Sequence, residues 1–126
     1  MGYHMNQQKA DFVIPFEQIN ATLAVIKNLK GNFSWVNTEK VAQATNIEEA
    51  FNAWRWIIEL DANDDIINIQ FRGEKLGDDK DLFDCIAQYV KEGSYIQMVG
   101  EDGEIWRWVF RNKQCIEVAA VLTFPE

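Results

Sequence analysis

Residues 93–124 read GSYIQMVGEDGEIWRWVFRNKQCIEVAAVLTF, and side-chain type alternates along them except at two short polar turns. Alternation of apolar and polar residues is typical of strands that bury one face. A glycine in residues 101–103 favours the first turn, and residues 111–113 supply the second. This stretch therefore predicts a three-strand antiparallel meander. Its middle strand would place on one face Trp106, Trp108 and Phe110.

A second group of strands is predicted upstream, at residues 54–60 and 66–72, with a polar turn between them. The apolar face of the first strand would carry Trp54, Trp56, Ile58 and Leu60. That of the second would carry Ile67, Ile69 and Phe71. Residues 10–16 favour a short strand, which Pro15 would confine to an edge or a bend.

Helical periodicity is found in three other segments, at residues 17–29, 39–50 and 79–91. The third has the clearest pattern, because an apolar stripe follows acidic residues that suit a helix N-terminus, and Asp78 is its expected cap. The chain is therefore predicted to be an α+β domain with an antiparallel sheet of about five strands. The strands form two hairpin-like groups, and the helices pack mainly on the tryptophan-rich face.

The tripeptide Trp-Arg-Trp occurs twice, at residues 54–56 and 106–108. Both copies follow a predicted helix and precede a further strand. Because the flanking sequences share little, the repeat is interpreted as similar strand chemistry and not as a duplication. Four tryptophans in these positions predict a thick aromatic core between sheet and helices.

The chain has 126 residues, the size of one domain, which is expected to span residues 5–126. Residues 1–4 resemble an expression remnant, so that the natural chain would begin at Met5. No apolar run approaches the length of a membrane span. Cys85 and Cys115 are too few for a disulfide framework and lack metal-ligand spacing, so buried free thiols in a reducing cytoplasm are expected.

Catalytic motifs are lacking in the sequence. Nucleophilic triads need an imidazole, and His4 is the only histidine. No glycine-rich phosphate loop is present. A calcium loop that began at Asp61 would need glycine at its sixth position and glutamate at its twelfth, where the sequence has Ile66 and Arg72. We therefore expect no enzyme activity, cofactor or metal.

The net charge of −8, from 20 acidic and 12 basic residues, favours a partner with a basic surface. The same charge disfavours binding to nucleic acid. The hypothesis is a protein-binding module, of the inhibitor or immunity kind, that presents an acidic rim from two turns. The rim would contain Asp61, Asp64, Asp65, Glu101, Asp102 and Glu104.

The second face of the sheet is the other candidate surface, because arginine and tyrosine combine contact area with hydrogen bonding. It is predicted to present Arg55, Ile57 and Glu59 on one strand, Asn68, Gln70 and Arg72 on its neighbour, and Tyr95, Gln97, Val99, Ile105, Arg107 and Val109 on the next two. Its last strand would add Cys115, Glu117, Ala119 and Val121. The residues expected to form an interface there are Arg55, Arg72, Tyr95, Gln97 and Arg107. Two alternatives remain open: a homodimer that buries this face, and a small-ligand or enzymatic domain with a pocket between sheet and helices, where Arg55 or Arg107 holds an anion.

Overall fold

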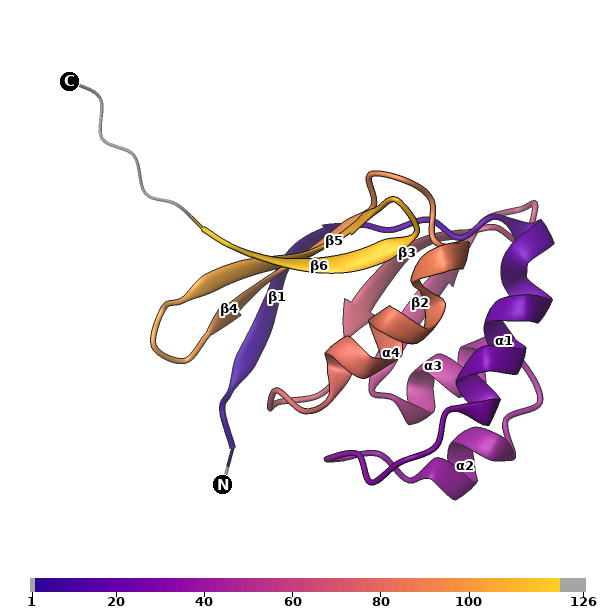
Figure 1. Ribbon diagram of the computed structural model, residues 1–126, viewed down its shortest axis with the longest axis horizontal. Coiled ribbons are helices and arrows are strands. Elements are labelled where there is room, and N and C mark those ends of the chain that lie inside the picture. The colour runs from indigo at the N-terminus through magenta and orange to yellow at the C-terminus, as the bar shows by residue number, and fades with distance from the viewer. Residues whose placement is uncertain (1, 121–126) are drawn as a thin grey trace.

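The structure is a computed structural model that describes residues 2–120 (Figure 1). Within these residues six strands form two antiparallel sheets, a four-stranded one ordered β1-β4-β5-β6 and a two-stranded one, β2-β3. The strands are β1 (Met5–Asp11), β2 (Trp56–Leu60), β3 (Ile66–Phe71), β4 (Tyr95–Gly100), β5 (Ile105–Arg111) and β6 (Gln114–Ala119). The α+β class, the antiparallel pairing and the C-terminal meander are confirmed. The single sheet of about five strands is instead two sheets.

The helices differ from the predicted segments mainly at their ends. They are α1 (Ile19–Asn28), α2 (Thr38–Ala42), α3 (Ile47–Ala53) and α4 (Asp79–Ile86). A 3₁₀ turn, η1 (Phe16–Gln18), precedes α1, and another, η2 (Ala87–Tyr89), follows α4. None of the helices in residues 2–120 combines the length and the apolar character that crossing a bilayer requires.

The helical segment predicted at residues 39–50 divides into two short helices, with Asn46 as the expected cap of the second and Asn37, in place of the expected Thr38, as the cap of the first. The Asn37 side chain accepts hydrogen bonds from the backbone N–H groups of Glu39 and Lys40, and the Asn46 side chain accepts one from Glu49. Asp78 does not cap α4 through its side chain. Its carboxylate instead accepts a hydrogen bond of 2.7 Å from the backbone N–H of Ser34.

The strand predicted at residues 10–16 starts earlier, at Met5, and lies between the two sheets. It pairs with β4 along its length, and an isolated bridge lies just beyond each of its ends, one between His4 and Lys75 and the other between Ile14 and Ile66 of β3. Between these bridges the side chain of Gln7 connects β1 to the backbone of β3. Its Nε2 donates to the carbonyl of Ile69 (2.9 Å), and its Oε1 accepts from the N–H of Phe71 (2.8 Å). One amide side chain thus links the two sheets.

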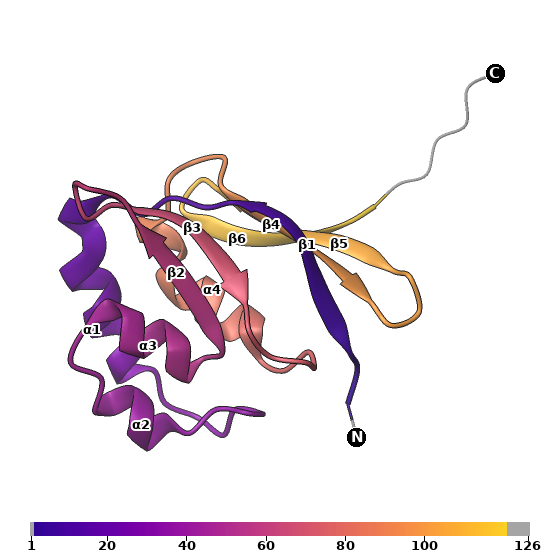
Figure 2. The same cartoon turned by 180° about the vertical axis from the view of Figure 1, so that it is seen from behind.

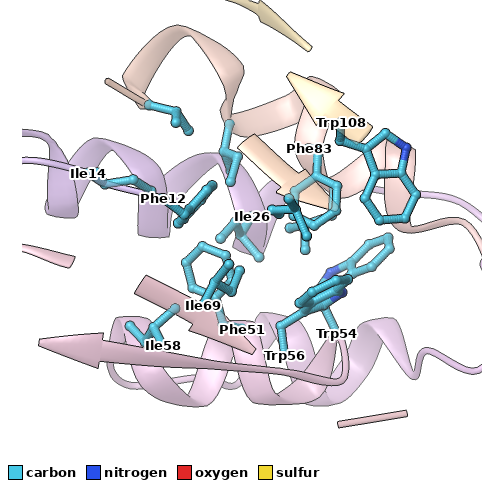
Figure 3. Close-up of a cluster of buried hydrophobic side chains, with 14 of the residues drawn as sticks. Phe12, Ile14, Ile26, Phe51, Trp54, Trp56, Ile58, Ile69, Phe83 and Trp108 are labelled. Carbon is cyan, nitrogen blue, oxygen red and sulfur yellow. The ribbon is translucent and has the colours of Figure 1, made fainter. Parts of the chain in front are cut away.

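The core lies between the helices and the tryptophan face, which we define as the face of the sheets that carries Trp56, Trp108 and Phe110 (Figure 3). Phe83 of α4 packs against all three of these rings, with centroid distances of 5.1, 5.1 and 6.0 Å. Trp106, Trp108 and Phe110 are buried, which confirms the predicted face of β5. Burial of this aromatic surface is the main stabilising contribution to the fold.

Three positions in the sheets differ from the predicted alternation. Trp54 is buried but ends α3, so β2 begins two residues later, at Trp56. The β2–β3 pairing shifts where Leu60 lies opposite Ile66, which leaves Ile67 as an extra, exposed residue. A bulge of this kind moves one residue out of the alternation. Ile66 therefore takes the place in the core that was predicted for Ile67.

The strand β6 has the opposite phase from the one predicted. Only Asn112 and Lys113 separate β5 from β6, and both have positive φ, 52° and 62°, as a two-residue hairpin turn requires. Cys115 therefore lies opposite Phe110, on the tryptophan face, and Glu117 and Ala119 follow on that face. The opposite face of β6 carries Ile116 and Val118. Val121 lies outside the described residues.

Candidate binding surface

The outer face is defined here as the side of the two sheets that the helices do not cover. In Figure 2 the strands β2 and β3 lie in front of α4, and the outer face of this hairpin points toward the viewer. Apolar side chains are exposed on this face, among them Ile57 (44%), Ile116 (38%) and Val118 (37%). Exposed apolar groups on an uncovered sheet face are typical of an interaction surface.

Four side chains on β1, β4 and β5 form a connected row across the outer face. The Nε of Arg107 donates to the Oε1 of Gln97 at 2.7 Å, and the Nε2 of Gln97 donates to the Oε1 of Gln8 at 2.7 Å. The guanidinium of Arg107 lies 4.2 Å from the ring centroid of Tyr95. These contacts fix the rotamers of long side chains, which lowers the entropy lost when a partner binds. Tyr95, Gln97 and Arg107 therefore lie together, as predicted.

A hollow of about 680 Å³ lies beside this row, where β1 meets the β2–β3 hairpin. The strand pairing places Ile57 beside Gln70 and Glu59 beside Asn68 on its outer rim. The lining residues are Asn6, Gln7, Gln8, Ile57, Ile58, Glu59, Asn68, Ile69, Gln70 and Phe71. Because β1 and β2–β3 both contribute, the hollow joins the outer faces of the two sheets into one surface.

Arg55 does not lie on the outer face, contrary to the prediction. It follows α3 with a φ of 74°, and its side chain turns toward the fully buried carboxylate of Asp79, with the closest contact at 3.0 Å. The Nη1 of Arg55 also donates to the carbonyl of Lys75 at 2.6 Å. At Gly77 a Cβ would lie 2.9 Å from the guanidinium, so glycine leaves room for this contact. Arg55 is thus a structural residue.

Arg72 follows the end of β3 and lies apart from the connected row. Its Nη1 donates to the Oδ1 of Asn52 on α3 at 3.0 Å. It lines a smaller hollow of about 270 Å³ together with Ile57 of the outer face and with Glu48 and Glu49 of α3. The predicted group of five therefore divides into three residues that lie together and two that do not.

The two acidic turns lie at opposite ends of the long axis of the molecule (Figure 1). The structure does not bring the six residues of the predicted rim together. In the β2–β3 turn Asp61 accepts hydrogen bonds from the N–H groups of Asn63 and Asp65, and Asp65 accepts one from Phe16. Asp64 occupies the turn position with positive φ, 62°. These carboxylates shape the turn and attach the start of η1 to it.

In the β4–β5 turn the carboxylates hold residues 3 and 4. Glu101 accepts a hydrogen bond from the backbone N–H of His4, and Asp102 accepts from the Tyr3 hydroxyl and from the N–H of Glu104. The hydrogen bond from Tyr3 lowers the pKa of Asp102 and raises the pKa of Tyr3 to about 12. Glu104 is exposed in the same turn. The acidic residues thus have structural roles at both ends.

Titratable groups elsewhere do not form a further cluster in the described part of the chain. Residues 2–120 contain no group of three or more His, Cys, Asp or Glu side chains that are placed to hold a metal ion. Cys85 and Cys115 are free. Burial raises the pKa of both thiols, and that of Cys115 to about 12. A thiol with such a pKa is a poor nucleophile at neutral pH.

The hollow and most of its lining were not predicted as a site. Ile57, Glu59, Asn68 and Gln70 were predicted only as second-face residues, and Asn6 and Gln8 belong to a strand that sequence alternation did not reveal. The amide-rich run NQQ at residues 6–8 was the available signal, but it gains meaning only beside β3. Searches against protein families, the curated proteins and the solved structures find no match to this chain. The surface is therefore interpreted from its own geometry.

Proposed function

We propose that the protein is a protein-binding module that uses the outer face, of the kind found in inhibitors and immunity proteins. The observation that carries this proposal is the uncovered sheet face with a connected row of Gln8, Gln97, Arg107 and Tyr95. Tyrosine and arginine are enriched among the residues that dominate binding energy. Fixed rotamers favour specific recognition of another folded protein.

The net charge of −8 supports a partner with a basic surface. Since the two acidic turns lie far apart, the charge is proposed to act at long range, by steering the partner, and not as one contact patch. The rate of association should then fall as salt rises. Binding that is insensitive to salt would contradict this part of the proposal.

A second copy of the chain is the alternative occupant of the outer face, favoured by the exposed Ile57, Ile116 and Val118. The charge weighs against it, because two copies that each carry −8 repel one another. Light scattering at increasing protein concentration and at two salt concentrations tests this alternative. A mass that stays at that of one chain excludes it.

The test of the proposed function uses two double variants with matched changes. Arg107→Ala with Ile116→Ser alters the outer face, whereas Lys40→Ala with Leu76→Ser alters exposed residues on α2 and in the loop before α4. Both remove one cation and one apolar side chain, and the exposures of Ile116 (38%) and Leu76 (36%) are similar. Proteins captured from a lysate of the source organism by the unaltered chain are purified, and their affinities for the three chains are measured.

The proposal expects the outer-face variant to lose at least tenfold in affinity, corresponding to about 1.4 kcal/mol, which is within the range of a hot-spot pair. The matched control variant should bind as the unaltered chain does. Equal affinities for all three chains would overturn the proposal that the outer face is the binding surface.

A further inference from the structure

We infer that the hollow between β1 and the β2–β3 hairpin receives an arginine side chain of the basic partner. This inference rests on the proposed function and deepens it, because it names the group that the surface recognises. It follows from the charge of the lining, the hydrogen-bonding groups at its rim and the apolar contact beside them.

The charge of the lining favours a cation. Glu59 is the single ionisable residue among the ten that line the hollow. Within residues 2–120 its carboxylate takes part in no ion pair and accepts no side-chain or backbone hydrogen bond. An exposed carboxylate with free acceptor positions gains a charge-assisted hydrogen bond when a cation enters.

Two further hollows in the described residues are less suited to a cation. The one beside α3 contains Arg72 in addition to its glutamates, and the one beside α2 contains Lys40. A cationic side chain that entered either would meet a positive charge already in place. The hollow at β1 is the one of the three whose charged lining is purely acidic.

The hydrogen-bonding groups favour arginine over lysine. Carboxamides share the lining with Glu59 on the strands β1 and β3, at Asn6, Gln8, Asn68 and Gln70. The side-chain carbonyl oxygens of Gln8 and Asn68 already accept one hydrogen bond each, from Gln97 and from the N–H of Ile69, and each keeps a second lone pair. Asn6 and Gln70 add side-chain acceptors that take part in no hydrogen bond within residues 2–120. A guanidinium presents five N–H donors in a plane and is matched by several spread acceptors, whereas an ammonium is a compact point charge.

Apolar surface beside the acceptors suits the guanidinium as well. Ile57 is 44% exposed and is paired with Gln70, next to the Glu59–Asn68 pair. A guanidinium is weakly hydrated on its faces, so it can lie on the branched apolar side chain of isoleucine while its edge is hydrogen-bonded. One side of the arginine would contact Ile57 and its edge would meet Glu59.

The test is a titration with acetyl-Gly-Arg-Gly-amide, followed by the side-chain amide signals of Asn6, Gln8, Asn68 and Gln70 in ¹H–¹⁵N spectra. Two control peptides replace arginine with citrulline, its uncharged isostere, or with lysine. The protein is used unaltered, as Glu59→Gln, and as Glu39→Gln, a matched loss of one exposed carboxylate on α2. Backbone spectra of the variants verify that each is folded.

The inference expects these amide signals to shift with a Kd on the order of 1–10 mM for the arginine peptide, as suits a single side chain. Glu59→Gln should weaken binding about tenfold, and Glu39→Gln should leave it unchanged. The citrulline and lysine peptides should bind at least about fivefold more weakly. Shifts confined to the acidic turns, equal affinity of Glu59→Gln, or equal affinity of the lysine peptide would each overturn the inference, as would the lack of any shift up to about 20 mM peptide.

The two proposals fail separately. If the arginine peptide does not bind but the outer-face double variant loses the partner, the proposed function stands and the arginine inference is wrong. If the peptide binds the hollow but the double variant retains the partner, the hollow is an arginine site and the proposed binding surface is wrong.

Discussion

The tripeptide Trp-Arg-Trp occurs in two regions, at the start of β2 and within β5, and a comparison of the two separates local from tertiary effects. The second tryptophan behaves alike in both. Trp56 donates its indole N–H to the carboxylate of Asp79 at 2.9 Å, and Trp108 donates to that of Glu117 at 2.8 Å. Asp79 is fully buried, however, whereas Glu117 is exposed.

The first tryptophan also behaves alike. The indole nitrogens of Trp54 and Trp106 are both buried, and neither has a hydrogen-bond partner within the described residues. An unpaired buried N–H costs free energy, which the large apolar area of the ring offsets. In both regions the first tryptophan thus contributes through packing and the second through packing and a hydrogen bond.

The arginine between the two tryptophans has a different conformation and different contacts in each copy. Arg107 lies in a regular strand and extends over Tyr95 on the outer face. Arg55 follows a helix in a left-handed conformation, which costs an ordinary residue roughly 1–2 kcal/mol, and this conformation directs its side chain toward the buried Asp79. The same three residues therefore give one arginine that can meet a partner and one that holds the fold together.

The largest effect is expected at the buried carboxylate. Asp79 accepts from Arg55, from Trp56 and from the N–H of Gly77. Asp79→Ala leaves a mostly buried guanidinium unpaired, so the free energy of unfolding should fall by about 3–5 kcal/mol, a large part of the stability of a small domain. Urea unfolding followed by tryptophan fluorescence measures this. Asp81→Ala, at an exposed position in the same helix, is the control and should change the stability by about 1 kcal/mol or less.

The matched pair Arg55→Met and Arg107→Met tests the comparison most directly, because the same change is made within the same tripeptide. Arg55→Met leaves Asp79 without its counter-ion and should cost about 3 kcal/mol. Arg107→Met removes a contact with Tyr95 on the outer face and should cost at most about 1 kcal/mol. Similar losses in the two variants would contradict the distinction drawn between the arginines.

Tryptophan-to-phenylalanine changes should give intermediate effects that depend on position within the tripeptide. Trp56→Phe removes a hydrogen bond to a buried carboxylate, so it should cost about 1–3 kcal/mol more than Trp54→Phe, which removes an unpaired N–H. Between Trp108→Phe and Trp106→Phe the difference should be smaller, about 1 kcal/mol, because water can replace the lost donor at the exposed Glu117. Thermal unfolding of the four variants ranks them.

The smallest effect is expected at the thiol of Cys115, which the short β5–β6 turn places on the tryptophan face. Burial raises its pKa from 9.0 to about 12 in the folded chain. Below pH 9 the thiol is protonated in both states and its contribution is fully present. Between pH 9 and 12 the unfolded chain loses the proton first, so this contribution declines as pH rises. The stability difference between the unaltered chain and Cys115→Ala should therefore shrink above pH 9.

A thiol of Cys115 that titrates near 9 in the folded protein would indicate an exposed position and would contradict its burial opposite Phe110. Alkylation rates at several pH values distinguish the two arrangements. Slow labelling up to about pH 10, compared with rapid labelling of the urea-unfolded chain, would agree with burial opposite Phe110.

Sequence alone was sufficient for much of the fold. The alternation in residues 93–120 predicted the meander and the buried face of β5, because side chains on a strand alternate with a period of two wherever the strand lies. Helical spacing located the start of α4 in the same way, although the helix ends at Ile86 and a 3₁₀ turn continues to Tyr89. These features depend on neighbours within a few residues, which is the range over which a pattern can be read.

The candidate site was predicted only in part, for a related reason. Tyr95, Gln97 and Arg107 lie together because they share a face of adjacent paired strands, which alternation predicts. The acidic rim was not formed, because the two turns belong to hairpins at opposite ends of the molecule. No local sequence pattern indicates how two hairpins are placed relative to each other.

Tertiary structure alone determined the remaining features. The polar strand MNQQKAD of β1 is held by β4 and by the Gln7 side chain, which bonds to residues 62 and 64 positions away. A bulge moved Ile67 out of the core, and a two-residue turn reversed β6. Arg55 became structural because Asp79, 24 positions away, is buried beside it. Apart from β1 and the phase of β6, the sequence by itself determined which segments are strands and helices and which faces are apolar, since these depend on local periodicity. Strand partners, bulges and buried charge pairs depend on contacts between distant residues, and the hollow at β1 exists only once they are made.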